Sequence, residues 1–302
     1  MLEYVYFILA KLNISKYLAK LLSHDKVTIL IYHNPKPDVF SLHALYLYEN
    51  YNFITLDAFL NAIENKSSKT LPKRALLVTF DDGHKGNIHL LDIFKKFKIH
   101  PTIYICTGII GTSNLFWWQA VKSRDEINEL KQFNNRDREH ILNIHYNYCP
   151  LAESSDITSA ALSLEDINKM VGHVNFQSHT KFHPILTTLD ESEKEREYLD
   201  SLNYLKNTIN PFAHSIAYPN GDYLESDFDY LKQLGYKSGR TTNPGWNSLR
   251  TNPYELRGIG ISDDASLAKL QFQLTGIFSY LVNILTGGRI SGKKKMIKPK
   301  QY

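Results

Sequence analysis

The chain has little cysteine, no long hydrophobic run and almost no excess of either charge. Its 302 residues include only two cysteines, Cys106 and Cys149, which are far apart and outside any C-x-x-C spacing. A disulfide scaffold and a cysteine-rich zinc site are therefore excluded. No stretch reaches the roughly 18 to 20 uninterrupted apolar residues of a membrane-spanning helix. The 35 basic and 31 acidic residues leave a net charge of +4, which gives no indication of nucleic acid as a partner.

The first 22 residues, MLEYVYFILAKLNISKYLAKLL, do not have the pattern of a secretion signal. Their apolar run from Tyr4 to Ala10 ends at Lys11, and Glu3 stands where a signal would carry positive charge. No small-residue cleavage site follows the run. We therefore expect a protein that stays in the cytoplasm.

Short apolar or β-branched runs alternate with helical segments along most of the chain. Strands are expected at 27–32, 75–80, 102–107, 174–178, 214–218, 236–241 and 257–262, and helices at 87–98, 189–209 and 227–235. This alternation predicts parallel βαβ units. Seven strands favour a closed or nearly closed β/α barrel in one large domain. Residues 112–170 form a long polar and aromatic insertion in it.

Polar side chains follow four of the expected strands directly. They are His33, the pair Asp81 and Asp82, His179, and the loop PNGD at 219–222. In a β/α barrel all strands end on the same face, so residues distant in sequence converge there. His179 and His183 are four residues apart and would face the same way on a helical turn. Two imidazoles and one carboxylate make a three-ligand metal site with positions open for water.

Each of these features also has an ordinary structural explanation. An H-x-x-x-H pair is often accidental in a chain with 12 histidines. Asp-Asp-Gly after a strand is commonly a turn with a helix cap, and His33 before Asn-Pro is compatible with a hydrogen-bonded loop residue. The conjunction favours a site, because all three features fall at strand ends in one topology.

Four motifs stand at or next to these strand ends: LIYHNP at 30–35, TFDDG at 79–83, SHTKFH at 178–183 and AYPNGDY at 217–223. Together they resemble the polysaccharide deacetylase family, carbohydrate esterase family 4, also called the NodB homology domain. The resemblance covers about residues 26–262 and is nearest to the poly-N-acetylglucosamine de-N-acetylase branch. It implies a distorted (β/α)7 barrel that uses a divalent metal to remove N-acetyl groups from amino sugars in glycans.

By position, the resemblance assigns a role to each motif residue. Asp81 matches the catalytic base, and Asp82, His179 and His183 match the metal ligands. Zinc is the favoured metal, although two imidazoles and a carboxylate also suit Co, Ni or Fe. A backbone N–H in the loop of Pro219, Asn220 and Gly221 would stabilise the charge that develops on the acetamide oxygen.

The sequence departs from the family pattern in two places. Many members carry R-x-P-Y where this chain has AYPN at 217–220, so an arginine that orients the base is missing. Arg257 is the candidate replacement. No Leu-x-His motif, the usual source of the general acid, is found near the C-terminus. His33 resembles the acid histidine of the poly-N-acetylglucosamine branch and is the second predicted catalytic residue, since an imidazole can protonate the departing amine.

The insertion contains LFWWQAV, in which Trp117 and Trp118 are adjacent. Adjacent side chains cannot face the same way, so we expect one of the two in the core and the other along a sugar groove. Two other functions remain open at this point. A catalytically silent glycan-binding module would explain the missing arginine, and a metal-dependent glycosyltransferase would explain the acidic pair but neither histidine.

Three regions are expected along the chain. An amphipathic segment occupies residues 1–25, the barrel residues 26–265, and an amphipathic and basic tail residues 266–302. The first segment spaces Leu2, Val5, Leu9 and Leu12 beside Lys16 or Lys20, and the tail carries Arg289, Lys293, Lys294, Lys295, Lys298 and Lys300. These segments are interpreted either as an amphipathic helix docked on the barrel followed by a frayed, solvated tail, or as peripheral contacts of both ends with anionic lipid on the inner membrane face. The second interpretation suits an N-acetylated, lipid-linked oligosaccharide as substrate.

Overall fold

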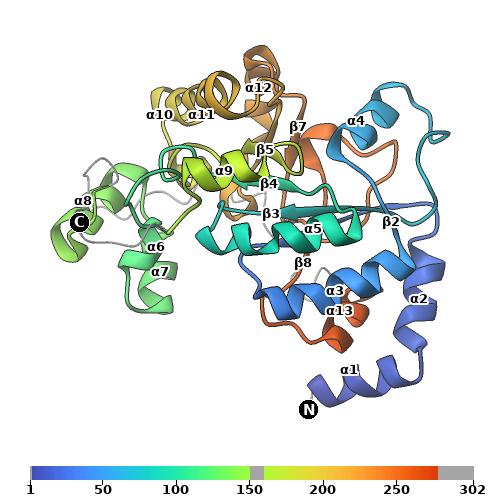
Figure 1. The fold of residues 1–302 in the computed structure, drawn as a ribbon. Coiled ribbons are helices and arrows are strands. Elements are labelled where there is room, and N and C mark those ends of the chain that lie inside the picture. Colours follow the sequence, from blue (N-terminus) through green and yellow to red (C-terminus); the bar gives the residue numbers. More distant parts are fainter. Residues whose placement is uncertain (1, 150–159, 278–302) are drawn as a thin grey trace.

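The computed structural model describes residues 2–149 and 160–277, which form a curled parallel sheet with helices around it (Figure 1). Its strands are β1 Val27–Tyr32, β2 Asn52–Phe53, β3 Ala75–Phe80, β4 Thr102–Ile105, β5 Asn175–Ser178, β6 Ser215–Ala217, β7 Ser238–Arg240 and β8 Ile259–Gly260. They are ordered β7-β6-β5-β4-β3-β1-β8, with the short β2 paired to β3. All seven predicted strands are present, and within these two described ranges only β2 was missed.

The two central strands explain why the site residues meet. Every residue of β1 and β3 is buried, as expected for apolar, β-branched strands of a parallel sheet covered on both faces. The register pairs Tyr32 with Phe80, so both strands end at the same level. His33 and Asp81 therefore leave the sheet side by side.

The sheet curls almost into a closed ring. On one side β1 pairs with β8 through Leu30 and Ile259. Just before β8, Leu256 forms a single parallel bridge to Arg240 at the end of β7. The distorted (β/α) barrel that the sequence predicted is therefore confirmed, with an irregular closure between its last two strands.

Helices cover the outside of the sheet where the sequence predicted them. The segment expected at 189–209 runs from α10 Glu191–Glu195 through α11 Ser201–Tyr204, with two π-helical turns between and after them, and ends at Ile209. The segment expected at 87–98 is a 3₁₀ turn followed by α5 Leu91–Phe97, and the one expected at 227–235 is α12 Phe228–Leu234. Two further helices are α3 Pro37–Asn50 and α4 Leu56–Glu64, the latter capped by the Thr55 hydroxyl, which accepts the Ala58 N–H.

The insertion forms a small helical unit at one end of the molecule, left of the sheet in Figure 1. This unit contains α6 Trp117–Ala120, α7 Arg124–Leu130 and α8 Asn135–Tyr146, whereas α9 Leu164–Met170 packs on the barrel core through Ile167 and Met170. The three helices of the unit enclose a separate hydrophobic cluster made of Trp117, Val121, Leu130, Phe133, Leu142 and Tyr148. This cluster fixes one face of α7 and leaves the other turned towards the barrel.

Two N-terminal helices, α1 Leu2–Lys11 and α2 Ile14–Leu22, pack against α13 Leu267–Gln273 (Figure 1). Among the described residues, no helix combines the length and apolar character needed to cross a membrane. The basic tail residues predicted from Arg289 onward lie outside the described residues. The region boundaries at residues 25 and 265 stay a prediction.

Candidate active site

The turn after β3 points its two carboxylates in different directions. Asp81 continues the strand and donates its backbone N–H to the Tyr32 carbonyl, whereas Asp82 has a φ of 69° and Gly83 a φ of 76°. A Cβ on Gly83 would lie 2.7 Å from Ile105 Cγ2, so only glycine fits this left-handed position. The strain at Asp82 is typical of a functional site.

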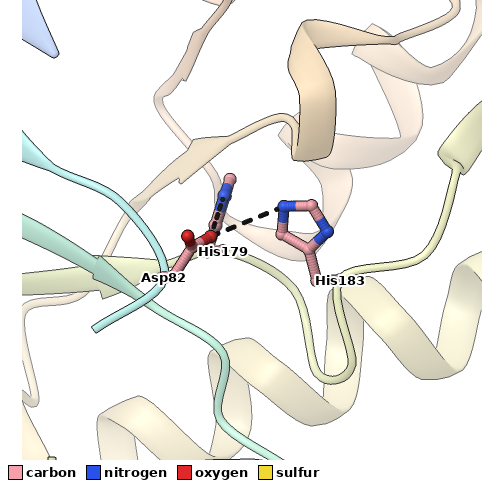
Figure 2. Close-up of side chains that lie close together, drawn as sticks. All are labelled: Asp82, His179 and His183. Atoms are coloured by element: carbon pink, nitrogen blue, oxygen red, sulfur yellow. Dashed lines mark ion pairs between the residues drawn. The ribbon is translucent and has the colours of Figure 1, made fainter. Parts of the chain in front are cut away.

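Asp82 meets His179 and His183 at the carboxyl end of β5, as Figure 2 shows. Asp82 Oδ1 lies 3.3 Å from His179 Nε2 and 3.5 Å from His183 Nε2. All three residues are buried, and their ligand atoms lie within 4.8 Å of one another. The structure therefore brings together the three predicted ligands.

The donor atoms of this cluster fit a divalent metal. His179 Nδ1 lies 2.8 Å from the Ala217 carbonyl oxygen, so this contact orients the ring and turns Nε2 towards Asp82. Burial, reinforced by the adjacent His179, lowers the pKa of His183 to about 3, so the His183 ring is neutral near pH 7. Ligand atoms around a tetrahedral zinc lie about 3.3 Å apart, close to the two distances from Asp82.

Asp82 is held ionised by the imidazoles around it. Burial alone would raise the pKa of this carboxyl, but His179 and His84 outweigh it and hold the pKa well below its usual value. His84 Nε2 lies 3.0 Å from Asp82 Oδ2, so the second carboxylate oxygen is engaged as well. Sequence reasoning missed His84, although it follows TFDDG directly and was visible in the motif.

The two histidine ligands are presented by a tight loop and not by the helical turn we predicted. Thr180 and His183 both have left-handed φ values, which breaks the helical path and still returns the second ring to the first. The loop is fixed by the Glu197 carboxylate, which accepts the N–H groups of Lys181 and Phe182 at 2.7 and 3.0 Å. Burial raises the pKa of Glu197 to about 7, despite these hydrogen bonds.

The side chain paired with Asp81 is that of Arg240, and this corrects the prediction for Arg257. The Arg240 guanidinium at the end of β7 is fully buried and forms an ion pair with Asp81 Oδ1. Its carbon lies 5.3 Å from the centre of the Tyr104 ring. Arg257 instead is exposed and lines another surface cavity together with Arg250. The arginine absent from AYPN is thus replaced from the next strand along the sheet.

A cavity of about 300 Å³ opens above these groups. It is lined by His33, Asp81, Asp82, Trp118, Arg124, Ile127, Asn128, Lys131, His179, His183, Asn220 and Thr242. The contribution of α7 and the residue after it, with Arg124, Asn128 and Lys131, was not foreseen. Nothing in the insertion's sequence indicates which face of α7 is turned towards the barrel.

Of the remaining predicted site residues, some line the wall of this cavity and one is buried in the hydrophobic cluster of the insertion. His33 is exposed and lines the cavity. Trp118 also lines it, with its ring 4.5 Å from that of His183. Trp117 is buried in the insertion and donates its Nε1–H to the His183 carbonyl at 3.2 Å, so it supports the ligand loop and does not face the cavity.

The predicted loop lies on the cavity wall as well. Pro219 and Gly221 are buried, and Asn220 lines the cavity with a left-handed φ of 55°. A Cβ on Gly221, whose φ is 76°, would collide with the Thr242 side chain and backbone. This close approach fixes the loop against the segment that follows β7.

Comparison with known sequences finds relatives that are named as polysaccharide or poly-N-acetylglucosamine deacetylases. YxkH of Bacillus subtilis (strain 168) is 24% identical over 252 residues, which are 80% of this chain and 73% of YxkH. Poly-beta-1,6-N-acetyl-D-glucosamine N-deacetylase of Staphylococcus aureus (strain MSSA476) is 26% identical over 219 residues. That match covers 70% of this chain and only 62% of the staphylococcal enzyme.

Solved structures show the same fold. The Streptococcus pyogenes deacetylase PplD in complex with acetate matches with a TM-score of 0.62 and 23% identity, covering 83% of this chain and 99% of PplD. IcaB from Ammonifex degensii matches with a TM-score of 0.56 and 18% identity, covering 84% of this chain and 97% of IcaB. The family model named polysaccharide deacetylase matches residues 68–239, more than half of the chain. The chain therefore belongs to the polysaccharide deacetylase family, as its motifs predicted.

Proposed function

We propose that the chain is a metal-dependent de-N-acetylase acting on N-acetylated amino sugars of a cell-surface glycan or its lipid-linked precursor. The observation that carries this proposal is that two adjacent carboxylates in one cavity have different partners. Three buried ligand atoms converge at Asp82, while the neighbouring Asp81 is paired with Arg240 and not with the histidines. Relatives named as poly-beta-1,6-N-acetyl-D-glucosamine N-deacetylase, and a structural neighbour that binds acetate, support the same chemistry.

Asp82, His179 and His183 would hold the metal, for which zinc is our first choice. Bound there, it supplies a nucleophile near neutral pH and polarises the acetyl carbonyl. His84 and the Ala217 carbonyl orient two of the ligands through their outer atoms. Such outer contacts fix ring orientation and ligand basicity in metal sites.

The chain's own groups perform the proton transfers. Water adds its oxygen to the acetyl carbon while Asp81 accepts one of its protons, and Arg240 keeps this carboxylate aimed at the cavity. The C–N bond then breaks as His33 protonates the sugar nitrogen, so that acetate and a free amine leave. His33 suits this role because it lines the cavity, and imidazole exchanges protons near neutral pH.

The loop after β6 offers one backbone donor to the acetyl oxygen. Pro219 has no N–H, and the Gly221 N–H donates to the Tyr218 carbonyl at 2.7 Å. Within this described loop, the Asn220 N–H is therefore the group assigned to the developing oxyanion. Trp118, Arg124 and Lys131 would contact the sugar beside the acetyl group.

Acetate release from a β-1,6-linked N-acetylglucosamine oligosaccharide tests the proposal. We expect release by the metal-loaded protein, loss after chelation, and recovery on adding back one equivalent of Zn²⁺. Oligosaccharide binding without acetate release at any metal loading would identify a silent glycan-binding module. Consumption of a nucleotide sugar without acetate release would identify a glycosyltransferase.

A further inference from the structure

Helices α1 and α2 have a buried side and an apolar outer side. On the buried side, Tyr6 packs against Phe272 of α13 with ring centres 4.9 Å apart, and the small residues Ser15 and Ala19 are only 1% exposed. This side attaches the two helices to the barrel. Their outer side carries the exposed residues Tyr4, Phe7, Ile8, Leu12, Ile14, Tyr17, Leu21 and Leu22, which we call the N-terminal apolar surface.

The N-terminal apolar surface is unusual within this molecule. It holds eight of the fifteen exposed large hydrophobic side chains among the described residues, all within 19 positions of the sequence. The most exposed are Tyr17 at 78%, Leu21 at 71% and Tyr4 at 70%. Single exposed hydrophobic residues are common on soluble proteins, but a concentrated group marks a surface that binds something.

The charges on these helices select the kind of partner. Lys11, Lys16 and Lys20 are exposed on the same two helices, and residues 4–22 contain no acid. Apolar and aromatic side chains bordered by lysines are typical of helices that lie in the interface of a bilayer. Anionic headgroups would pair with the lysines while the apolar side chains enter the acyl region.

Two other occupants fit these charges less well. A second copy of the chain would bring the same three lysines against their counterparts, and like charges repel. The chain's own segment after residue 277 begins with the apolar run FSYLVNIL at 278–285, but its charged residues are all basic: Arg289, Lys293, Lys294, Lys295, Lys298 and Lys300. It therefore offers no partner for the three lysines.

We propose that the N-terminal apolar surface binds an anionic lipid bilayer of the kind found on the inner membrane face. The face differs from the one predicted. The sequence suggested one helix with Leu2, Val5, Leu9 and Leu12 in line, but Asn13 has a left-handed φ of 56° and divides the segment into two helices. The side chains of Leu2 and Val5 lie outside the description, and Leu9 is half-buried.

Vesicle cosedimentation of the full chain tests the proposal. The probes are phosphatidylcholine vesicles with and without phosphatidylglycerol at about a third of the lipid, in salt from about 0.05 to about 0.5 M. We expect binding only to the anionic vesicles, weakening as salt rises. Replacing Lys11, Lys16 and Lys20 by Gln should weaken it by about fivefold per lysine.

A matched pair of triple variants isolates the surface. Phe7→Gln/Tyr17→Gln/Leu21→Gln should abolish vesicle binding, whereas Leu42→Gln/Ile144→Gln/Phe212→Gln, which alters equally exposed residues elsewhere, should not. Both variants should keep the wild-type melting temperature and release acetate from a soluble oligosaccharide at the wild-type rate. This readout separates the surface from the catalytic proposal.

Three outcomes would overturn the proposal. The first is no cosedimentation with anionic vesicles at low salt. The second is equal binding by wild type and the first triple variant. The third is a dimer that forms with rising protein concentration and is lost in that variant without any vesicle binding, which would make a second copy the occupant.

Discussion

Asp81 and Asp82 are consecutive residues, yet each is neutralised by a different region of the molecule. Asp81 faces β7 and pairs with Arg240, a cation that cannot lose its proton in a protein. Asp82 faces the loop after β5 and lies among three imidazoles. The left-handed φ of Asp82 separates the two directions.

This difference explains how two adjacent carboxylates acquire two roles. A carboxylate held by arginine needs no further cation and stays available as a base. A buried carboxylate whose oxygen faces two imidazole nitrogens, by contrast, is placed to bind a metal ion together with them. Substitutions on either side should therefore separate metal binding from turnover.

The largest effect is expected from removing a ligand. His179→Ala, His183→Ala and Asp82→Ala should each abolish stoichiometric zinc binding and reduce acetate release to background, because two ligands do not hold the ion. Elemental analysis after dialysis measures the metal directly. Full zinc occupancy in all three variants would exclude this site.

Asp81→Asn should lower turnover without removing the metal. The amide keeps the shape but cannot accept a proton, so we expect zinc to be retained and kcat to fall by roughly 10² to 10⁴. Steady-state kinetics and metal analysis of the same preparation check both statements. If zinc is lost while turnover per bound metal is unchanged, base and ligand have been exchanged.

Arg240 should show a graded effect. Arg240→Met leaves Asp81 buried without its partner and should lower the free energy of unfolding by about 3 to 5 kcal/mol, along with kcat. Arg240→Lys keeps the charge but loses the fork geometry, so we expect partial recovery of both. Arg257→Met is the control and should resemble wild type in kcat, since Arg257 is exposed at another cavity.

His84 should tune the metal without holding it. His84→Phe keeps the ring beside Phe116 but removes the contact with Asp82 Oδ2, so zinc affinity should fall by roughly 10 to 100-fold. His84→Gln retains a hydrogen-bond donor, so its zinc affinity should lie between those of wild type and His84→Phe. Competition with a chromogenic chelator measures the dissociation constants, and identical values for all three proteins would contradict the assignment.

The smallest effect concerns Glu197 and the loop that carries His183. Its pKa is raised from 4.5 to about 7 in the folded chain, so the folded state binds more protons than the unfolded state between these values. This group's contribution to stability should therefore fall as pH rises from about 4.5 to 7 and then level off. Glu197→Gln should flatten that part of the profile of melting temperature against pH, and an unchanged slope would count against the buried acid.

The strand ends were predictable because their signals are local. Apolar, β-branched runs followed by His33, Asp81 and His179 identify both the strands and the polar groups that leave them. The convergence of these groups follows from parallel strands ending at one face. His84 was equally accessible, because it stands next to the motif.

Other features depend on tertiary register and left no local signal. Arg240 lies inside the expected strand YKSGRT, and only the sheet order places it opposite Asp81. Asn13 divides the first 22 residues into two helices. The exposed apolar face is therefore made of other side chains than those that one continuous helix would present. The orientation of α7, and with it Lys131, depends on a cluster formed by the insertion itself.

Because β1 lies between β3 and β8, we expect its pairing to form slowly and to be completed only after the end of the barrel has been synthesised. Leu30 pairs with Val78 early in the sequence but with Ile259 only near the end of the barrel. Pairings so distant along the chain have a high entropic cost before they form and lengthen folding times. Until β8 is synthesised, one edge of β1 has no strand beside it, and such edges promote aggregation. The strand that leads directly to His33 is therefore among the first made and among the last completed.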